Sequence, residues 1–319
     1  MGTLRSALRF APIIKTLPWG GRRLASLLGK RLPDGPCGES WEVVDLPGEQ
    51  SRVVDGEHAG RALAELVRDE RRALLGEADL LEGRFPLLFK FIDAARVLSV
   101  QVHPDAHACA RLGGGARPKT EAWYVLHAEP GARLYLGLRP GVEPEALRRA
   151  LQTGELEPLL QPVEVAAGDF FFIPAGLLHA IGAGIVLAEI QQSSDTTYRV
   201  FDWNRAGLDG KPRPLHTAEA LESIRFELHG RIESPALDSG RPGVRSDFFS
   251  FERLDIAPGH GEAIEPGRPV ILACIAGAGR LEAGAGAIEL ERGASCLLPA
   301  CLAGELRSRA GGRFLAARA

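Results

Sequence analysis

Three polar side chains that could bind a metal or a substrate recur at every second position of one short stretch. In residues 98–103, Leu-Ser-Val-Gln-Val-His, apolar side chains alternate with Ser99, Gln101 and His103. Strict alternation is typical of a β-strand that buries one face. Because positions two apart share a face, the Gln101 amide and the His103 imidazole can reach the same ion. The stretch therefore predicts a strand whose polar face carries chemistry.

A second candidate ligand follows a set of turn residues in the stretch GDFFFIPAGLLH (168–179). Gly168, Pro174, Gly176 and His179 fit the second motif of cupins, G-x5-P-x-G-x2-H. In that motif the turn residues bring the next strand into a β-barrel with its histidine facing inward. A lone inward histidine is often only a hydrogen-bonded core residue, so His179 needs partners before a metal site can be inferred.

The partners of His179 come from an earlier region of the chain, which resembles the first motif of cupins. Gln101-x-His103 takes the place of its two spaced ligands, and Glu121 follows in the stretch PKTEAWYVL. Together with His179 these residues predict one divalent metal site. Two imidazoles, an amide oxygen and a carboxylate suit Zn²⁺ with an open position for substrate, so we expect one Zn²⁺ per chain. Fe²⁺, Mn²⁺ and Co²⁺ are alternatives that the donor set also permits.

Composition narrows the class of protein. The length of 319 residues indicates two domains. The formal net charge of −3 gives no reason to expect nucleic acid or a membrane surface as a partner. The five cysteines are odd in number and lack a C-x-x-C pair, which favours a reducing compartment. We therefore expect a cytoplasmic protein. We also expect a monomer or a weak homodimer, although no feature of the sequence indicates the oligomeric state.

Short strand-like runs with glycine turns dominate the chain and position these residues. We expect a mainly β fold of two cupin-like jelly-roll β-barrels with a few short helices. The helices are expected over 57–76, ending at Gly76, and over three shorter ranges: 104–112, 142–154 and 217–224. The polar segment 231–242 reads as a linker.

An internal repeat supports the second barrel. GDFFFIPA (168–175) and GASCLLPA (293–300) share their glycine and their Pro-Ala pair. The later copy has no Gly-x-x-His after it, and His260 lacks a second histidine nearby. We therefore expect a catalytic metal-binding domain over 1–230, including the helical segment near 57–76, and a smaller cupin-like domain without metal over 231–319.

Several stretches together resemble the type I mannose-6-phosphate isomerase family in its short bacterial form. The resemblance runs from about Leu17 to Ile224 and more weakly beyond, and it rests on five stretches: GESWEVVD, LFKFIDAARVLSVQVHPD, KTEAWYVL, GDFFFIPAGLLHAIG and EIQQSSDTTYRVFDWNR. It implies a zinc-dependent aldose–ketose isomerase that interconverts mannose 6-phosphate and fructose 6-phosphate through a cis-enediol(ate). The family's zinc ligands fall on the four residues already named.

The resemblance also implies roles in the substrate pocket. It places Arg199, Lys119 and Glu189 in catalysis, and Lys90 and Ser99 in binding the sugar phosphate. Glu189 and Lys119 both remain candidates for the base that moves the proton. Alternative interpretations make Glu189 a salt-bridge partner of Arg199 and Lys90 a solvated residue at a strand end.

Two positions depart from longer family members. Pro118 stands where they often carry a histidine, and Ile181 stands where they tend to have a tyrosine. Substrate specificity is therefore open, as is the residue that opens the sugar ring. The alternatives are another metal-dependent cupin acting on a different sugar phosphate, or a cupin that binds sugars without catalysis.

Overall fold

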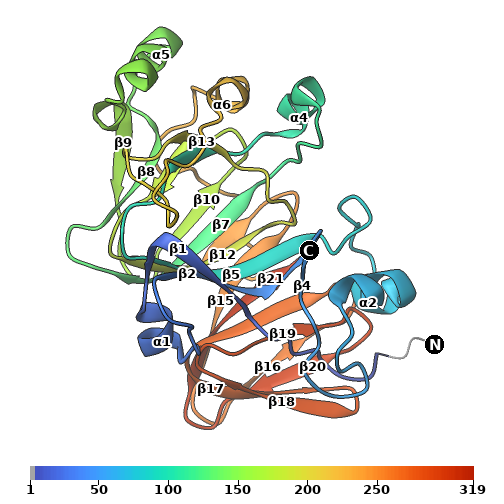
Figure 1. Ribbon diagram of the computed structural model, residues 1–319. Coiled ribbons are helices and arrows are strands. Elements are labelled where there is room, and N and C mark those ends of the chain that lie inside the picture. The colour runs from blue at the N-terminus through green and yellow to red at the C-terminus, as the bar shows by residue number, and fades with distance from the viewer. Residues whose placement is uncertain (1–3) are drawn as a thin grey trace.

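The computed structural model of the protein describes residues 4–319. The fold is mainly β, with two cupin-like β units and a few short helices, as the sequence predicts (Figure 1). The first unit contains two antiparallel sheets. One sheet has six strands in the order β1 (Ile13–Gly21), β2 (Cys37–Val43), β5 (Leu87–Ala94), β12 (Ile185–Gln192), β7 (Glu121–Ala128) and β10 (Phe170–Ile173).

The second sheet of this unit lies against the first and contains the strand that carries Gln101. Its order is β13 (Tyr198–Phe201), β6 (Val100–Val102), β11 (His179–Ile181), β8 (Arg133–Leu138) and β9 (Leu160–Glu164). Val100 and Val102 of β6 are fully buried, which confirms the alternation seen in the sequence. A small hairpin, β3 (Asp45–Leu46) and β4 (Glu49–Gln50), stands apart from both sheets.

The C-terminal unit is one eight-stranded sheet folded around β17 (Val270–Ala283), which is 14 residues long. The main path runs β14 (Gly243–Arg245), β15 (Ser250–Ile256), β21 (Gly312–Arg318), β17, β20 (Gly304–Arg307) and β16 (Gly261–Ile264). The remaining two strands also pair with β17 and are β18 (Gly286–Glu291) and β19 (Ser295–Leu298).

The helices are short and lie at the ends of the sheets. They are α1 (Arg23–Leu28), α2 (Leu63–Asp69), α3 (Arg71–Leu75), α4 (Ala106–Leu112), α5 (Pro144–Thr153) and α6 (Thr217–Ser223), with one 3-10 turn, η1 (Glu157–Leu159). The expected helices over 104–112, 142–154 and 217–224 are confirmed as α4, α5 and α6 within two residues at each end. α1 was not expected, because six residues are too few for a periodic pattern to show.

The expected single helix over 57–76 is wrong in its extent. Residues 57–60 form a turn in which Gly60 has a φ of 83°, and the first helix begins only at Leu63, where Glu65 accepts a hydrogen bond from the Ala62 amide. The backbone at Glu70 leaves helical geometry with a φ of −125°, so α2 and α3 are separate. The end at Gly76 is confirmed.

The internal repeat corresponds to a repeated local structure. Gly168 and Gly293 both have positive φ, 100° and 86°, and each precedes a short strand, β10 or β19. Gly168 donates to the Val125 carbonyl at 2.8 Å, and Gly293 donates to the Cys274 carbonyl at 2.8 Å. The same turn therefore enters equivalent strands of the two units.

One large apolar core joins the two units. It includes Phe89 and Phe251, whose rings lie edge to face at 6.3 Å. The N-terminal segment also crosses to the C-terminal unit, because Leu8 and Leu297 exchange two backbone hydrogen bonds of 2.8 Å. Residues 231–242 contain neither helix nor strand, although Ile232 forms a bridge to Phe172. The division at residues 230 and 231 stays a prediction.

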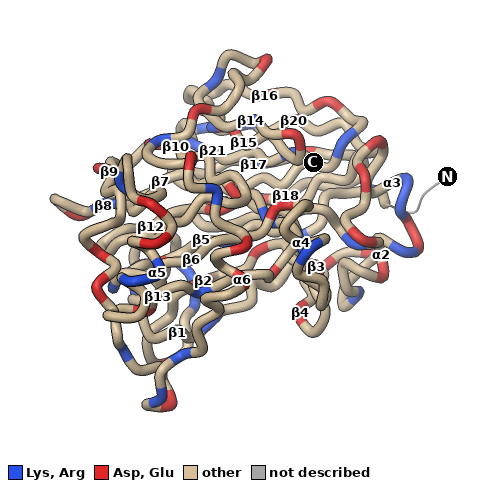
Figure 2. The backbone as a smooth tube through the Cα atoms, turned by 90° about the horizontal axis from the view of Figure 1, so that it is seen from above, with Lys and Arg blue, Asp and Glu red and all other residues tan. Residues whose placement is uncertain are grey.

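Charge is distributed without a one-sided face. Figure 2 shows basic and acidic segments interspersed over the described chain, in keeping with the net charge of −3. Within residues 4–319, no helix is long and apolar enough to cross a lipid bilayer.

Candidate active site

The candidate active site is a cavity of about 440 Å³ between the two sheets of the first unit. Its walls carry side chains from both sheets, and its charged and amide groups are Lys15, Glu39, Glu49, Lys90, Gln101, Lys119, Glu121, Glu189, Asp195, Arg199 and Arg213. Ser99 and Ile181 also line it. Every predicted site residue except the two histidines is thus in the wall, and the histidines contact Glu121 directly behind it.

Strand register explains why these residues meet. On the five-stranded sheet, Gln101 of β6 lies directly opposite His179 of β11 on one side and Arg199 of β13 on the other. On the six-stranded sheet, Glu189 of β12 lies opposite Lys90 of β5 and Trp123 of β7. Residues opposite one another point to the same face of a sheet. Each sheet therefore presents one row of functional side chains to the cavity.

His103, Glu121 and His179 form a buried cluster in which one ligand atom of each lies within 4.8 Å of the others. His103 Nε2 is 3.1 Å from Glu121 Oε1, and His179 Nε2 is 3.8 Å from Glu121 Oε2. Gln101 adds its amide, with Nε2 3.2 Å from His179 Nε2. A half-turn of that amide exchanges its nitrogen and oxygen, so the oxygen can face the same point.

Both imidazoles are oriented by backbone carbonyl groups. The Nδ1 atom of His103 lies 2.9 Å from the Thr196 carbonyl oxygen, and that of His179 lies 2.9 Å from the Leu177 carbonyl oxygen. A carbonyl can only accept, so Nδ1 carries the proton and Nε2 keeps its lone pair. Burial lowers the pKa of both rings, to about 4 for His103, which keeps them neutral. Neutral imidazoles with fixed rings are the form that binds metal ions.

The carboxylate of Glu121 completes the fit. Burial alone would raise its pKa, but Lys119 and His103 outweigh burial and hold the pKa well below the ordinary value. Neither of its oxygens has a hydrogen-bond partner among the described residues, nor does His103 Nε2, although Lys119 Nζ lies 2.5 Å from Oε1 as an ion pair. Buried polar atoms normally have partners. These unpaired atoms point at one another, so the residues present fit a bound cation.

Glu189 and Lys90 form the second charged group of the cavity. Glu189 Oε1 lies 3.0 Å from Lys90 Nζ, and Oε2 accepts a hydrogen bond of 2.8 Å from the Trp123 indole. Burial raises the pKa of Glu189, repulsion by Glu121 adds to this, and Lys90 opposes both. The alternative in which Glu189 pairs with Arg199 is wrong, because its cationic partner is Lys90.

Lys90 is buried and is not the solvated strand-end residue of the alternative interpretation. Burial lowers its pKa, but Glu189 and then Glu39 outweigh burial and raise it. Glu39 Oε2 lies 3.4 Å from Lys90 Nζ and accepts the Trp41 indole at 2.5 Å. Lys90 therefore remains charged between two carboxylates.

Arg199 enters the cavity from the opposite sheet. Its Nη1 donates to the Pro214 carbonyl at 2.8 Å, while its Nε is buried and lacks a partner among the described residues. Burial and the nearby Arg213 lower its pKa. Asp202 holds Arg213 through two hydrogen bonds, of 2.7 and 2.5 Å. A guanidinium with a free N–H beside a second arginine is suited to bind an anion.

Sequence reasoning missed several wall residues. Lys15, Glu39 and Arg213 line the cavity, and Trp123 and Asp202 hold Glu189 and Arg213 from outside its lining, but none of the five was given a role in the site. The sequence held one usable signal: only five lysines occur in a chain rich in arginine, and three of them, Lys15, Lys90 and Lys119, line this cavity.

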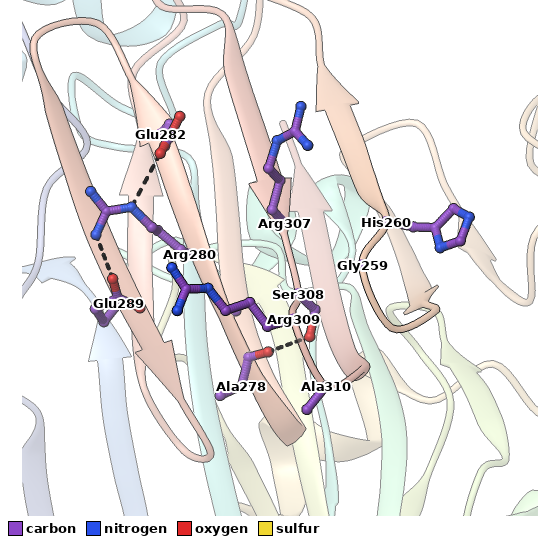
Figure 3. Close-up of a pocket in the computed structure, with 11 residues that line it drawn as sticks. Gly259, His260, Ala278, Arg280, Glu282, Glu289, Arg307, Ser308, Arg309 and Ala310 are labelled. Atoms are coloured by element: carbon purple, nitrogen blue, oxygen red, sulfur yellow. Dashed lines mark hydrogen bonds and ion pairs between the residues drawn. The ribbon is translucent and has the colours of Figure 1, made fainter.

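The C-terminal unit holds a second cavity, of about 530 Å³, on the outer face of β17, β18 and β20 (Figure 3). Arg280 pairs there with Glu282 at 3.1 Å and with Glu289 at 2.5 Å. His260 is exposed and points away from Arg280 and Arg307 (Figure 3). Its Nδ1 lies 3.0 Å from the Pro258 carbonyl oxygen. Among the described residues, a group of three or more His, Cys, Asp or Glu side chains close enough to share a metal ion is found only in the first unit, at His103, Glu121 and His179. That the C-terminal unit binds no metal stays a prediction.

Comparisons with known proteins agree with the site. Residues 7–132 match the family described as phosphomannose isomerase type I, catalytic domain, and residues 243–304 match mannose-6-phosphate isomerase, cupin domain. The chain is 41% identical over 218 residues to the mannose-6-phosphate isomerase ManA of Bacillus subtilis, covering 68% of this chain and 67% of that protein. It is 42% identical over 206 residues to the mannose-6-phosphate isomerase of Streptococcus mutans, covering 65% and 64%.

A solved structure extends the likeness to the whole fold. The mannose 6-phosphate isomerase from Bacillus subtilis superposes with a TM-score of 0.86 and 30% identity, covering 98% of this chain and 99% of that one. The matched regions include both sheets of the cavity and the C-terminal unit. The chain therefore belongs to the type I mannose-6-phosphate isomerase family.

Proposed function

We propose that the protein interconverts mannose 6-phosphate and fructose 6-phosphate with one Zn²⁺ bound at the cluster described above. The observation that carries this proposal is the shared cavity, in which Glu121 and the two histidines stand beside Lys119, Lys90, Glu189 and Arg199. A metal site, titratable carboxylates and several cations converge where a sugar phosphate could enter. A protein that only stores or senses a sugar does not need this combination.

Gln101, His103, Glu121 and His179 would hold the metal. When bound, a divalent ion supplies positive charge that stabilises the negative charge developing on the sugar oxygens during proton transfer. The mixture of two nitrogen and two oxygen donors favours Zn²⁺, with Fe²⁺, Mn²⁺ and Co²⁺ as alternatives. Lys119, in contact with Glu121, fixes the carboxylate from the side of the cavity.

The reaction moves one proton between neighbouring carbons without any net oxidation. A base takes the proton from C2 of the open-chain aldose while the C1 carbonyl oxygen gains a proton, which gives the cis-enediol. Return of a proton to C1 and loss of the proton from the C2 hydroxyl then give the ketose. Glu189 and Lys119 are the two candidates for the base, since both face the cavity.

The cationic side chains of the cavity would bind the negatively charged parts of the substrate. Arg199 and Lys90 would balance the enediolate and the phosphate dianion, and Ser99 would donate to or accept from the substrate at the same wall. Arg199 is suited to this role because its Nε has no other partner among the residues described. The sugar phosphate is the only partner that the proposal requires. The five cysteines are free thiols, which supports placing the protein in the reducing cytoplasm. We propose that it acts as a monomer or a weak homodimer.

The test is direct. Purified protein is incubated with mannose 6-phosphate and Zn²⁺, and fructose 6-phosphate is measured, with glucose 6-phosphate as a control substrate. We expect conversion that a chelator abolishes and Zn²⁺ restores. Full conversion in a rigorously metal-free sample would contradict the metal-dependent mechanism, and no conversion by the zinc-loaded protein would contradict the function itself.

A further inference from the structure

We infer that Trp123 is a positioning residue for the isomerisation, fixing the carboxylate of Glu189 through its indole N–H. This inference rests on the proposed function and deepens it. Trp123 is fully buried in β7, and its Nε1 donates to Glu189 Oε2 at 2.8 Å. The two residues lie directly opposite each other on neighbouring strands, so the register of the sheet brings their side chains together.

The two oxygens of Glu189 are held differently, and this difference defines the role. Oε2 is occupied by the indole, whereas Oε1 contacts Lys90 Nζ at 3.0 Å and has no hydrogen bond within the described chain. The carboxylate is thus held from both sides by β5 and β7, the strands that flank its own. Oε1 is the oxygen left to exchange a proton with a molecule in the cavity.

A purely structural tryptophan does not need this arrangement. A buried indole N–H requires an acceptor, and a backbone carbonyl serves equally well. Trp203 shows that alternative in the same chain, because its indole donates to the Leu98 carbonyl at 2.7 Å. Trp123 instead donates to a cavity carboxylate, while its ring edge packs on His179 with centroids 5.4 Å apart at 73°.

Trp123→Phe separates the two contacts. Phenylalanine keeps an aromatic ring beside His179 but has no donor for Glu189 Oε2. The carboxylate can then rotate away from its working orientation, and a misplaced catalytic group costs up to about 100-fold in rate. We expect kcat to fall by roughly 10- to 100-fold with KM within about threefold of wild type. The zinc content should stay at one per chain.

A double-mutant cycle tests whether the effect passes through Glu189. Trp123→Phe is measured in the wild-type and Glu189→Gln backgrounds, with kcat, KM, zinc content and melting temperature recorded for each. If Trp123 acts by positioning Glu189, its replacement lowers kcat in the wild-type background only. Trp203→Phe, which removes an indole donor outside the cavity, should keep wild-type kcat. If the Phe variant does not fold, Trp123→Met, whose flexible side chain can fill the space and also has no donor for Glu189, enters the same cycle.

Three results would overturn the inference. The first is an unchanged kcat in Trp123→Phe, and the second is an equal loss of kcat in both backgrounds. The third is loss of zinc together with activity, which would show that Trp123 acts through His179. Each of these requires an active wild-type enzyme, whereas an inactive wild type would overturn the proposed function and the inference with it.

Discussion

Replacing Lys90 with methionine tests the charge arrangement of the cavity. The Lys90 ammonium is buried and forms ion pairs with Glu189 at 3.0 Å and Glu39 at 3.4 Å. Methionine occupies a similar volume but leaves both carboxylates without their shared cation. Removing one partner of a buried ion pair leaves an uncompensated charge and costs about 3–5 kcal/mol. We expect Lys90→Met to lower the free energy of unfolding by this amount at a mildly alkaline pH.

Glu189 gives this loss a pH dependence. Burial already raises its pKa, and without Lys90 the pKa must rise further. The folded variant then holds a proton that the unfolded chain releases above about pH 4.3. Extra proton binding by the folded state stabilises it at low pH, so stability falls as the pH rises from the unfolded pKa through the raised folded pKa. The deficit relative to wild type should be smaller at about pH 5 than at about pH 8.

The free energies of unfolding of four proteins in urea test whether Lys90 balances the charge of Glu189. They are the wild type, Lys90→Met, the double variant Lys90→Met/Glu189→Gln, and Lys15→Met as the matched control. Lys15 also lies over the Trp41 ring, at 4.5 Å against 5.7 Å for Lys90, but its ion pair with Glu49 is partly exposed. Exposed pairs contribute about 0–1 kcal/mol. The double variant should regain part of the lost stability, because the more deeply buried of the two unpaired charges, that of Glu189, is gone, while Glu39 keeps its hydrogen bond from the Trp41 indole.

Two outcomes would refute this reasoning. One is a loss in Lys90→Met that is no larger than the loss in Lys15→Met at alkaline pH. The other is a double variant that is no more stable than Lys90→Met. Either would show that the buried ammonium does not balance the Glu189 carboxylate.

The remaining predictions concern the metal, the arginine and the repeated turn. A chelator should abolish isomerase activity. Metal analysis should give one zinc per chain, and a second zinc that survives His179→Ala would contradict the expectation that the C-terminal unit binds no metal. Arg199→Ala should lower kcat by about 100-fold with unchanged zinc content; lost melting temperature with near-normal kcat would instead indicate a structural role. Gly293→Ala should cost more than about 2 kcal/mol in urea unfolding, because a Cβ there would lie 1.9 Å from the Leu28 carbonyl oxygen. Gly168→Ala, with nothing within 4 Å of a Cβ, should cost only about 1 kcal/mol, and equal losses would contradict the steric argument.

The sequence predicted the features that depend on short-range spacing. Gln101 and His103 share a strand face because side chains alternate, and the turn glycines Gly168 and Gly293 occupy equivalent positions because the same turn is used twice. Glu121 and His179 were placed by motif, and the structure brings both to the same point. The roles of these residues stay predictions until metal and activity are measured.

What the sequence could not predict depends on pairing between distant strands. Lys90 meets Glu39 and Glu189 because β2, β5 and β12 are neighbours, although these residues lie far apart along the chain. The suggested pair of Glu189 with Arg199 fails for the same reason, since the two residues belong to facing sheets. Hydrophobic periodicity also gave no sign of the break at Glu70, where the backbone leaves the helix between two stretches that both bury leucines.

The pairing of Leu8 with Leu297 has a consequence for the chain while it is being synthesised. The segment around Leu8 leaves the ribosome well before Leu297, but its hydrogen-bonding partner and much of its apolar cover belong to the C-terminal unit. Until residue 297 has emerged, the apolar side chains of this segment face water or whatever protein will shield them. Exposed apolar surface of this kind makes nascent chains prone to aggregate and is what chaperones bind. The enzyme should therefore acquire its native core only after residue 297 has emerged, and chains truncated before it that contain the whole active-site sequence should still be degraded or aggregate.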